Sequence, residues 1–227
     1  MIIGGFQKFS LIDYPGKLSC IVFTQGCNFR CPYCHNPELI PFTLGRVEEK
    51  TVLSFLEKRK EKIDAVVITG GEPTMQQDLL KFIQKIRGRG YLIKLDTNGS
   101  NPKMLETIIN HSLVDYIAMD IKAPLEKYNV ITHSLVCSER IRESIGLIMH
   151  SGIKYEFRTT VVKSQLSKKD ILSIGKLIEG AELYILQKFI PSKTLDPNFS
   201  NEKTYSDEEL RSLKRKLEKF VCKCLVR

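Results

Sequence analysis

The 227-residue sequence lacks the features that would place it in a membrane or in the secretory pathway. No apolar stretch approaches the roughly 18 residues that a transmembrane helix requires. The N-terminal segment has no basic stretch followed by a long apolar run, which excludes a secretory signal of the usual pattern. We therefore expect a cytoplasmic protein with no membrane partner.

Internal repeats, low-complexity tracts and clear domain linkers are also missing. Hydrophobic residues make up 42% of the sequence and charged residues 27%, as in ordinary globular proteins. A chain of this length can bury a core without disulfides. We predict a single domain spanning residues 1–227, with a core of about 16–190.

Acidic residues are scarce relative to basic ones. Lys and Arg total 35 and Asp and Glu total 26, which gives a formal net charge of +9. This excess of positive charge has two explanations that fit equally well. One is a solvated basic surface, and the other is an acidic partner, either nucleic acid or an acidic protein. Charge alone does not choose between these readings.

Apolar, β-branched runs alternate with segments of helical period. Ser167 with Asp170, and Ser206 with Glu209, form predicted capping boxes for two of the helices. Sequential β–α units predict a parallel sheet, and six are fewer than the eight of a closed barrel. The predicted fold is α/β, a partial (β/α)6 barrel (an open TIM-like barrel) with an extra C-terminal helix at about 206–224. The predicted strands are residues 19–24, 65–69, 91–96, 116–121, 155–162 and 183–189.

Three of the seven cysteines follow the first predicted strand, with three and then two residues between them. A loop with this spacing can wrap around one inorganic cluster. A [4Fe–4S] cluster normally takes four thiolates, so Cys27, Cys31 and Cys34 would leave one iron open to bind and reduce a small ligand. The alternative is a structural zinc site with His35 as fourth ligand, although its adjacency to Cys34 strains tetrahedral closure.

Polar segments end the next three predicted strands. They are Gly-Gly-Glu-Pro at 70–73, Asp-Thr-Asn-Gly at 96–99 and Asp-Ile-Lys at 120–122. Taken singly, they read as a turn, a β–α loop and a strand-end ion pair. Together they lie at the rim of the sheet that also carries the three thiols, which favours one shared site.

These segments resemble the radical S-adenosylmethionine superfamily. Residues 5–16 (GFQKFSLIDYPG), 23–27 (FTQGC) and 34–37 (CHNP) narrow the resemblance to the activating enzymes of glycyl radical enzymes. Within that group, the chain is most similar to the branch that activates anaerobic ribonucleoside-triphosphate reductase. The resemblance covers roughly residues 4–190.

The resemblance implies reductive cleavage of S-adenosylmethionine to a 5′-deoxyadenosyl radical, which generates a glycyl radical on a partner enzyme. The implied cofactors are one [4Fe–4S] cluster and S-adenosylmethionine, with a monovalent cation near Asp96 and Asp120. The implied protein partners are a glycyl radical enzyme and an acidic electron donor such as flavodoxin or ferredoxin. A nucleic-acid partner is not expected.

The resemblance also assigns roles to individual residues. Cluster ligation falls to Cys27, Cys31 and Cys34, and Lys122 joins them as a catalytic residue. The positions expected to contact S-adenosylmethionine are Tyr33, Gly70, Gly71, Glu72, Asp96, Thr97, Asn98, Asp120, Lys122, Arg158 and Gln187. An interior Arg158 reads equally well as part of a structural ion pair.

Two other functions stay open on the sequence alone. One is a radical enzyme that acts on a small molecule or an RNA nucleoside. The other is a zinc-stabilised nucleic-acid-binding module, although zinc would not require the polar segments at the strand ends. Cys222 and Cys224, a pair on the predicted last helix, are interpreted as packing or incidentally exposed residues in preference to metal ligands.

Overall fold

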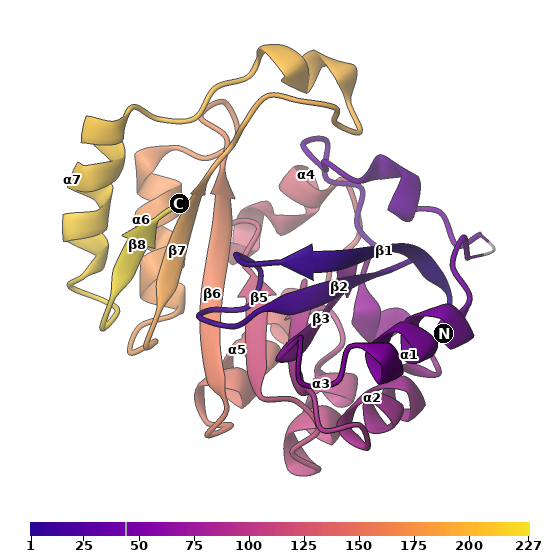
Figure 1. The fold of residues 1–227 in the computed structure, drawn as a ribbon. Helices are drawn as coiled ribbons and strands as arrows, with labels where there is room; N and C mark the ends of the chain where they lie inside the picture. Colours follow the sequence, from indigo (N-terminus) through magenta and orange to yellow (C-terminus); the bar gives the residue numbers. More distant parts are fainter. Residues whose placement is uncertain (44) are drawn as a thin grey trace.

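A single eight-stranded sheet organises the chain in the computed structural model, which describes residues 1–43 and 45–227 (Figure 1). Strand order in the sheet follows strand order in the sequence, from β1 to β8. β1 pairs antiparallel with β2, and every later pair is parallel. The strands are β1 (Ile3–Ser10), β2 (Ser19–Thr24), β3 (Ala65–Gly70), β4 (Leu92–Thr97), β5 (Tyr116–Asp120), β6 (Lys154–Val161), β7 (Tyr184–Lys188) and β8 (Cys224–Val226).

Helices connect the parallel strands. In Figure 1, α6 and α7 lie beside β6, β7 and β8, while α1, α2 and α3 lie on the side of β3 and β4. The α-helices are α1 (Glu49–Lys58), α2 (Leu79–Arg87), α3 (Pro102–Asn110), α4 (Tyr128–Thr132), α5 (Ser138–Met149), α6 (Lys168–Leu177) and α7 (Asp207–Leu217). Short 3-10 helices are η1 (Pro37–Leu39), η2 (Pro73–Met75), η3 (Leu125–Lys127) and η4 (Pro197–Asn201).

Side chains on the two faces of the sheet enter two separate cores. Val66 and Ile68 of β3 join the large core between the sheet and the helices. Ala65 and Val67 of the same strand face the other way and join a small core around Tyr116. Alternation along a strand produces this division. The small core fills one part of the inner face, so polar side chains further along the strands share the remaining interior.

The six predicted parallel strands and the open α/β barrel are confirmed. The sheet runs from β1 at one end to β8 at the other, so the barrel is not closed. Neither of these outer strands was predicted from the sequence. Among the described residues, no helix is long and apolar enough to cross a membrane.

The predicted end of the C-terminal helix is wrong. The capping box of Ser206 and Glu209 begins α7 as predicted, but the helix ends at Leu217. Cys224 instead starts β8, opposite Tyr184 of β7. The chain leaves the helix because β7 offers an unpaired edge, and Cys222 already donates its backbone N–H to the Ala181 carbonyl at 2.9 Å. The Cys222 and Cys224 pair is therefore not helical.

Candidate active site

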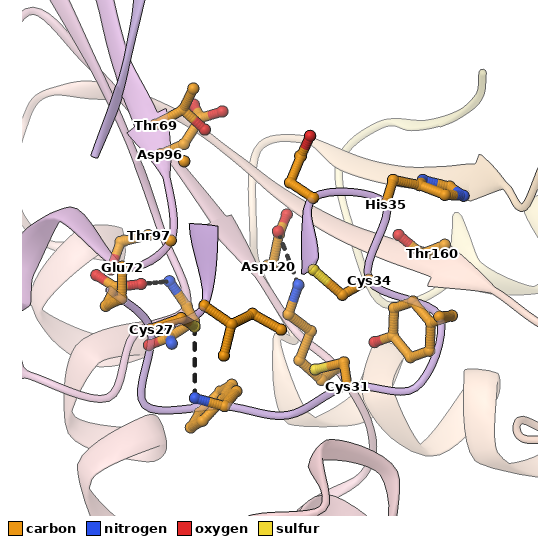
Figure 2. Close-up of a pocket in the computed structure, with 18 of the residues that line it drawn as sticks. Cys27, Cys31, Cys34, His35, Thr69, Glu72, Asp96, Thr97, Asp120 and Thr160 are labelled. Carbon is orange, nitrogen blue, oxygen red and sulfur yellow. Dashed lines mark hydrogen bonds and ion pairs between the residues drawn. The ribbon is translucent and has the colours of Figure 1, made fainter. Parts of the chain in front are cut away.

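A cavity of about 210 Å³ lies where the cysteine loop faces the carboxyl ends of the parallel strands (Figure 2). Residues from separate β–α loops converge on it because parallel strands all end at one edge of the sheet. The lining includes most of the residues named by the sequence: Cys27, Cys31, Tyr33, Cys34, Gly70, Gly71, Glu72, Asp96, Thr97, Asn98, Asp120, Lys122 and Arg158.

Backbone hydrogen bonds hold the cysteine loop from several sides. Cys27 N donates to the Ile40 carbonyl at 3.0 Å, and the Cys34 carbonyl accepts from Leu195 N at 3.0 Å. Gly26 begins the loop with φ of +99°, a conformation that favours glycine, and a Cβ there would collide with the Phe42 ring. These contacts fix the loop in a conformation in which its three thiols face one cavity.

Burial raises the pKa of each of these thiols, that of Cys27 to about 12. The raised pKa means that the thiols are protonated at neutral pH when no metal charge lies beside them. A bound metal deprotonates a coordinating thiol outright. Binding of a metal by these thiols would therefore release protons.

His35 does not join the thiols. Its ring stacks on Phe189 at a centroid distance of 5.4 Å, and its Nε2 lies 3.1 Å from the Ile190 carbonyl oxygen. Figure 2 shows the ring directed away from the cysteine side chains. No group of three His, Cys, Asp or Glu side chains in the described part of the chain is arranged around a single ion. A cluster binds its thiolates on different irons, so its ligands need not converge on one atom.

Glu72 holds two loops together. Its Oε1 accepts hydrogen bonds from Thr74 Oγ1 at 2.5 Å and Thr97 Oγ1 at 2.7 Å, and its Oε2 accepts from Asn98 N at 2.6 Å. The side chain is fully buried, and that burial raises its pKa against the lowering effect of these donors. The carboxylate therefore links the loop after β3 to the loop after β4.

Gly70 and Gly71 pack against protein backbone. A Cβ on Gly70 would lie 2.4 Å from Thr24 N, and one on Gly71 would lie 2.1 Å from the Gly26 carbonyl oxygen. Glu72 N also donates to that same Gly26 carbonyl at 2.8 Å. The two glycines thus allow the β3 loop to contact the start of the cysteine loop directly.

A network of ion pairs crosses the interior from β4 to β6. Arg158 Nε lies 2.7 Å from Asp120 Oδ1, and its guanidinium reaches Asp96 Oδ2 at 3.1 Å. Lys122 Nζ pairs with Asp120 Oδ2 at 2.9 Å, and Lys94 Nζ pairs with Asp96 Oδ1 at 2.7 Å. Every carboxylate oxygen of the two aspartates therefore faces a protein cation.

The network sets the charge of both aspartates. Burial disfavours their ionised forms, but Arg158 and Lys94 hold the pKa of Asp96 below its usual value. Arg158 and Lys122 likewise hold the pKa of Asp120 well below its usual value. Both groups are carboxylates throughout the physiological range.

One predicted residue lies elsewhere, because Gln187 sits on β7, outside the cavity lining. Asn98 lines the cavity, and its side chain donates to Asn28 Oδ1 at 2.9 Å. Lys94 and the cavity-lining Thr69 and Thr160 were not predicted from the sequence. Strand alternation could have found Lys94, because it lies two residues before Asp96 on the same face of β4.

In the sequence, Arg30 lies inside the cysteine loop and Lys8 and Lys17 lie shortly before it, which makes them candidates for steering an acidic electron donor to the loop. In the structure they are not all near it. Lys17 precedes β2, whereas the loop follows that strand, so the two lie at opposite ends of it. Lys8 lies on β1 next to Gln7, which pairs with Ile21 near the middle of β2. Arg30 is in the loop, but its guanidinium donates to the Cys27 carbonyl at 2.6 Å.

Sequence comparison finds relatives along the whole chain. A model described as the Radical SAM superfamily matches residues 21–177. A Methanocaldococcus jannaschii protein named as a glycyl-radical enzyme activating enzyme is 33% identical over 100% of this chain and 95% of its own length. A pyruvate formate-lyase-activating enzyme of Clostridium pasteurianum is 28% identical over 96% of each chain.

Structural comparison gives the same fold at lower identity. Streptococcus suis SuiB bound to S-adenosylmethionine superposes with a TM-score of 0.68 at 14% identity, covering 91% of this chain and 49% of SuiB. A domain of the pyruvate-formate lyase-activating enzyme from Bacteroides vulgatus gives 0.57 at 16% identity, covering 72% of this chain and 99% of that domain. The open barrel is thus shared with these proteins.

Proposed function

Because the chain belongs to the radical S-adenosylmethionine superfamily, we propose that it activates a glycyl radical enzyme by placing a radical on a glycine of that partner. The observation that carries this proposal is the single cavity in which three loop thiols meet the polar strand ends. The relatives supply the substrate class, since two that match nearly the whole chain are named as activating enzymes. Anaerobic ribonucleoside-triphosphate reductase is the first partner to test.

The family implies a [4Fe–4S] cluster and S-adenosylmethionine, and the chemistry of the residues that line the cavity suits both. Cys27, Cys31 and Cys34 would supply three iron ligands and leave one coordination position for the second cofactor. The buried Tyr33 hydroxyl makes no hydrogen bond within residues 1–43 and 45–227, so it is available to a ligand. When bound together, these cofactors supply one-electron cleavage of a sulfonium carbon–sulfur bond and a 5′-deoxyadenosyl radical.

The chain's own part is to position the cofactor and exclude water. We assign Glu72 to fixing the β3 and β4 loops, because its carboxylate already accepts hydrogen bonds from both. With these loops fixed by Glu72, the backbone of Gly70 and Gly71 would contact the amino group of the methionine part of S-adenosylmethionine. Lys122 and Arg158 provide positive charge for the methionine carboxylate.

The sequence also predicted a monovalent cation near Asp96 and Asp120. Protein ammonium and guanidinium groups already face the carboxylate oxygens at which such a cation would bind. A mobile cation at this place would have to displace one of these groups.

Electron delivery is assigned to an acidic donor of the flavodoxin or ferredoxin type. The net charge of +9 favours encounter with such a protein. Of Lys8, Lys17 and Arg30, only Arg30 lies in the cysteine loop. Any electrostatic steering of the donor by these three residues would therefore depend on Arg30.

The proposal is tested with anaerobically reconstituted protein and each glycyl radical enzyme from the same source. We expect a glycyl radical signal by electron paramagnetic resonance that requires S-adenosylmethionine and reductant. The Cys31→Ala variant serves as the matched control and should give no signal. Formation of 5′-deoxyadenosine without a radical on any of these partners would contradict the proposal and favour a small-molecule substrate.

A further inference from the structure

The ammonium group of Lys94 is buried inside the barrel beside the proposed cofactor site. Its side chain is 3% exposed, and its Nζ lies 2.7 Å from Asp96 Oδ1. Tyr116 lies opposite Lys94 in the sheet, and the Nζ is 6.0 Å from the centroid of the Tyr116 ring. Burying a cation costs free energy unless the cation is paired, so Asp96 and the Tyr116 ring stabilise the ammonium group in this position.

The ion pairs around Lys94 occupy the oxygens at which a free cation would bind. Three cations, on Lys94, Lys122 and Arg158, face the two carboxylates of Asp96 and Asp120. Glu156 lies further along the network, 3.9 Å from Arg158 and 3.5 Å from Arg227. Each carboxylate oxygen of the two aspartates therefore has a protein cation as its partner, and a free cation would have to displace one of them.

We propose that Lys94 is a built-in counterion that occupies the place of a mobile monovalent cation beside Asp96. It acts as a positioning residue: the ammonium fixes the Asp96 carboxylate, which in turn fixes Arg158 at 3.1 Å. The inference rests on the proposed function only in taking this cavity as the site of S-adenosylmethionine. It specifies that binding of this cofactor needs neither sodium nor potassium.

Two substitutions separate the charge of Lys94 from its volume. Lys94→Ala removes the ammonium and leaves space that a small cation and water can fill. Lys94→Met removes the charge but retains most of the volume. The surface variant Lys85→Ala, which loses only an exposed pair with Glu49, is the matched control.

The first measurement is S-adenosylmethionine binding by calorimetry to the reconstituted full chain, at constant ionic strength in choline, sodium, potassium or ammonium chloride. The wild type and Lys85→Ala should bind equally in all four salts. Lys94→Ala should bind about tenfold more weakly in choline, the loss expected for one charge-assisted hydrogen bond, and recover in the smaller cations. Lys94→Met should bind weakly in every salt.

The second measurement is thermal unfolding of the chain without its cluster in the same salts. Potassium or ammonium should raise the melting temperature of Lys94→Ala alone. A wild type that requires sodium or potassium, or Ala and Met variants that respond alike, would overturn the proposal. If neither variant folds, Lys94→Arg decides: it should stay independent of the cation, and a requirement for one would refute the idea. No glycyl radical partner is needed, so this inference can fail while the proposed function holds.

Discussion

Replacing Arg158 with Met should destabilise the protein more than any surface charge substitution. The guanidinium bridges Asp96 and Asp120 from β6, and its side chain is only 12% exposed. Removing one partner of a buried ion pair costs about 3–5 kcal/mol because the remaining charges lose their compensation. Lys94 and Lys122 still face the two carboxylates, so we expect the lower end of that range. About 3 kcal/mol lowers the melting temperature of a chain this size by about 6–12 °C.

The destabilisation should depend on pH with a definite sign. Asp96 and Asp120 have pKa values held below the usual one by their cationic partners. A depressed carboxyl pKa stabilises the folded protein above the unfolded-state pKa of about 3.9, and this stabilisation is lost as the pH falls below that value. Arg158→Met removes much of the depression. The difference in unfolding free energy between wild type and variant should thus be full at neutral pH and shrink below about pH 4.

Urea unfolding of the reduced chain without its cluster, followed by circular dichroism at several pH values, measures both effects. Arg89→Met is the control, because Arg89 pairs with an exposed Glu57 at the surface. Such pairs contribute about 0–1 kcal/mol. An Arg158→Met loss no larger than the control, or one that stays constant from neutral pH to pH 3, would refute the reasoning about the buried network.

Three more predictions concern the cavity. Single Ala substitutions of Cys27, Cys31 and Cys34 should abolish iron and sulfide binding after anaerobic reconstitution, while circular dichroism shows an intact fold. The exposed Cys137→Ala variant is the control and should bind iron and sulfide normally. Normal iron binding by any of the first three variants would exclude that residue as a ligand. Glu72→Gln should cost about 1–3 kcal/mol in unfolding free energy even without cofactor, because an amide nitrogen replaces one acceptor. Unchanged stability with weakened cofactor binding would instead assign the carboxylate to the ligand. Arg30→Glu should slow cluster reduction by a protein donor, more so at low ionic strength, while a small chemical reductant is less affected; equal salt responses would separate this charge from electron delivery.

The parallel core of the fold could be predicted because its signal is local. β3 and β7 are short apolar runs between helical segments, and sequential β–α units define their neighbours. β8 could not be predicted. It is three residues long, and Cys224 continues the apolar stripe of the preceding helix. The free edge of β7, which is a tertiary feature, decides its conformation.

That the candidate site residues lie together at one edge of the sheet was predictable from the order of the strands, but their side-chain contacts were not. Parallel strands place Asp96 and Asp120 at one rim whatever their partners are. The sequence could not show that Glu72 is saturated by donors from two loops, since those donors are 2 to 26 positions away. Nor could it show that His35 turns to Phe189, 154 positions on, because stacking depends on the folded path of the last third of the chain.

The order of the strands in the sheet, which repeats their order in the sequence, also bears on how the barrel assembles. Each new β–α unit can dock onto the unit made just before it, so most strand pairing needs only modest loop closure. The ion pairs of the interior differ in how far apart their partners lie in the sequence. Asp96 is 62 positions from Arg158, whereas Lys94 is two positions away on its own strand. During stepwise growth of the sheet, Lys94 can neutralise Asp96 before β6 is in place, which spares the partly built barrel an unpaired buried charge.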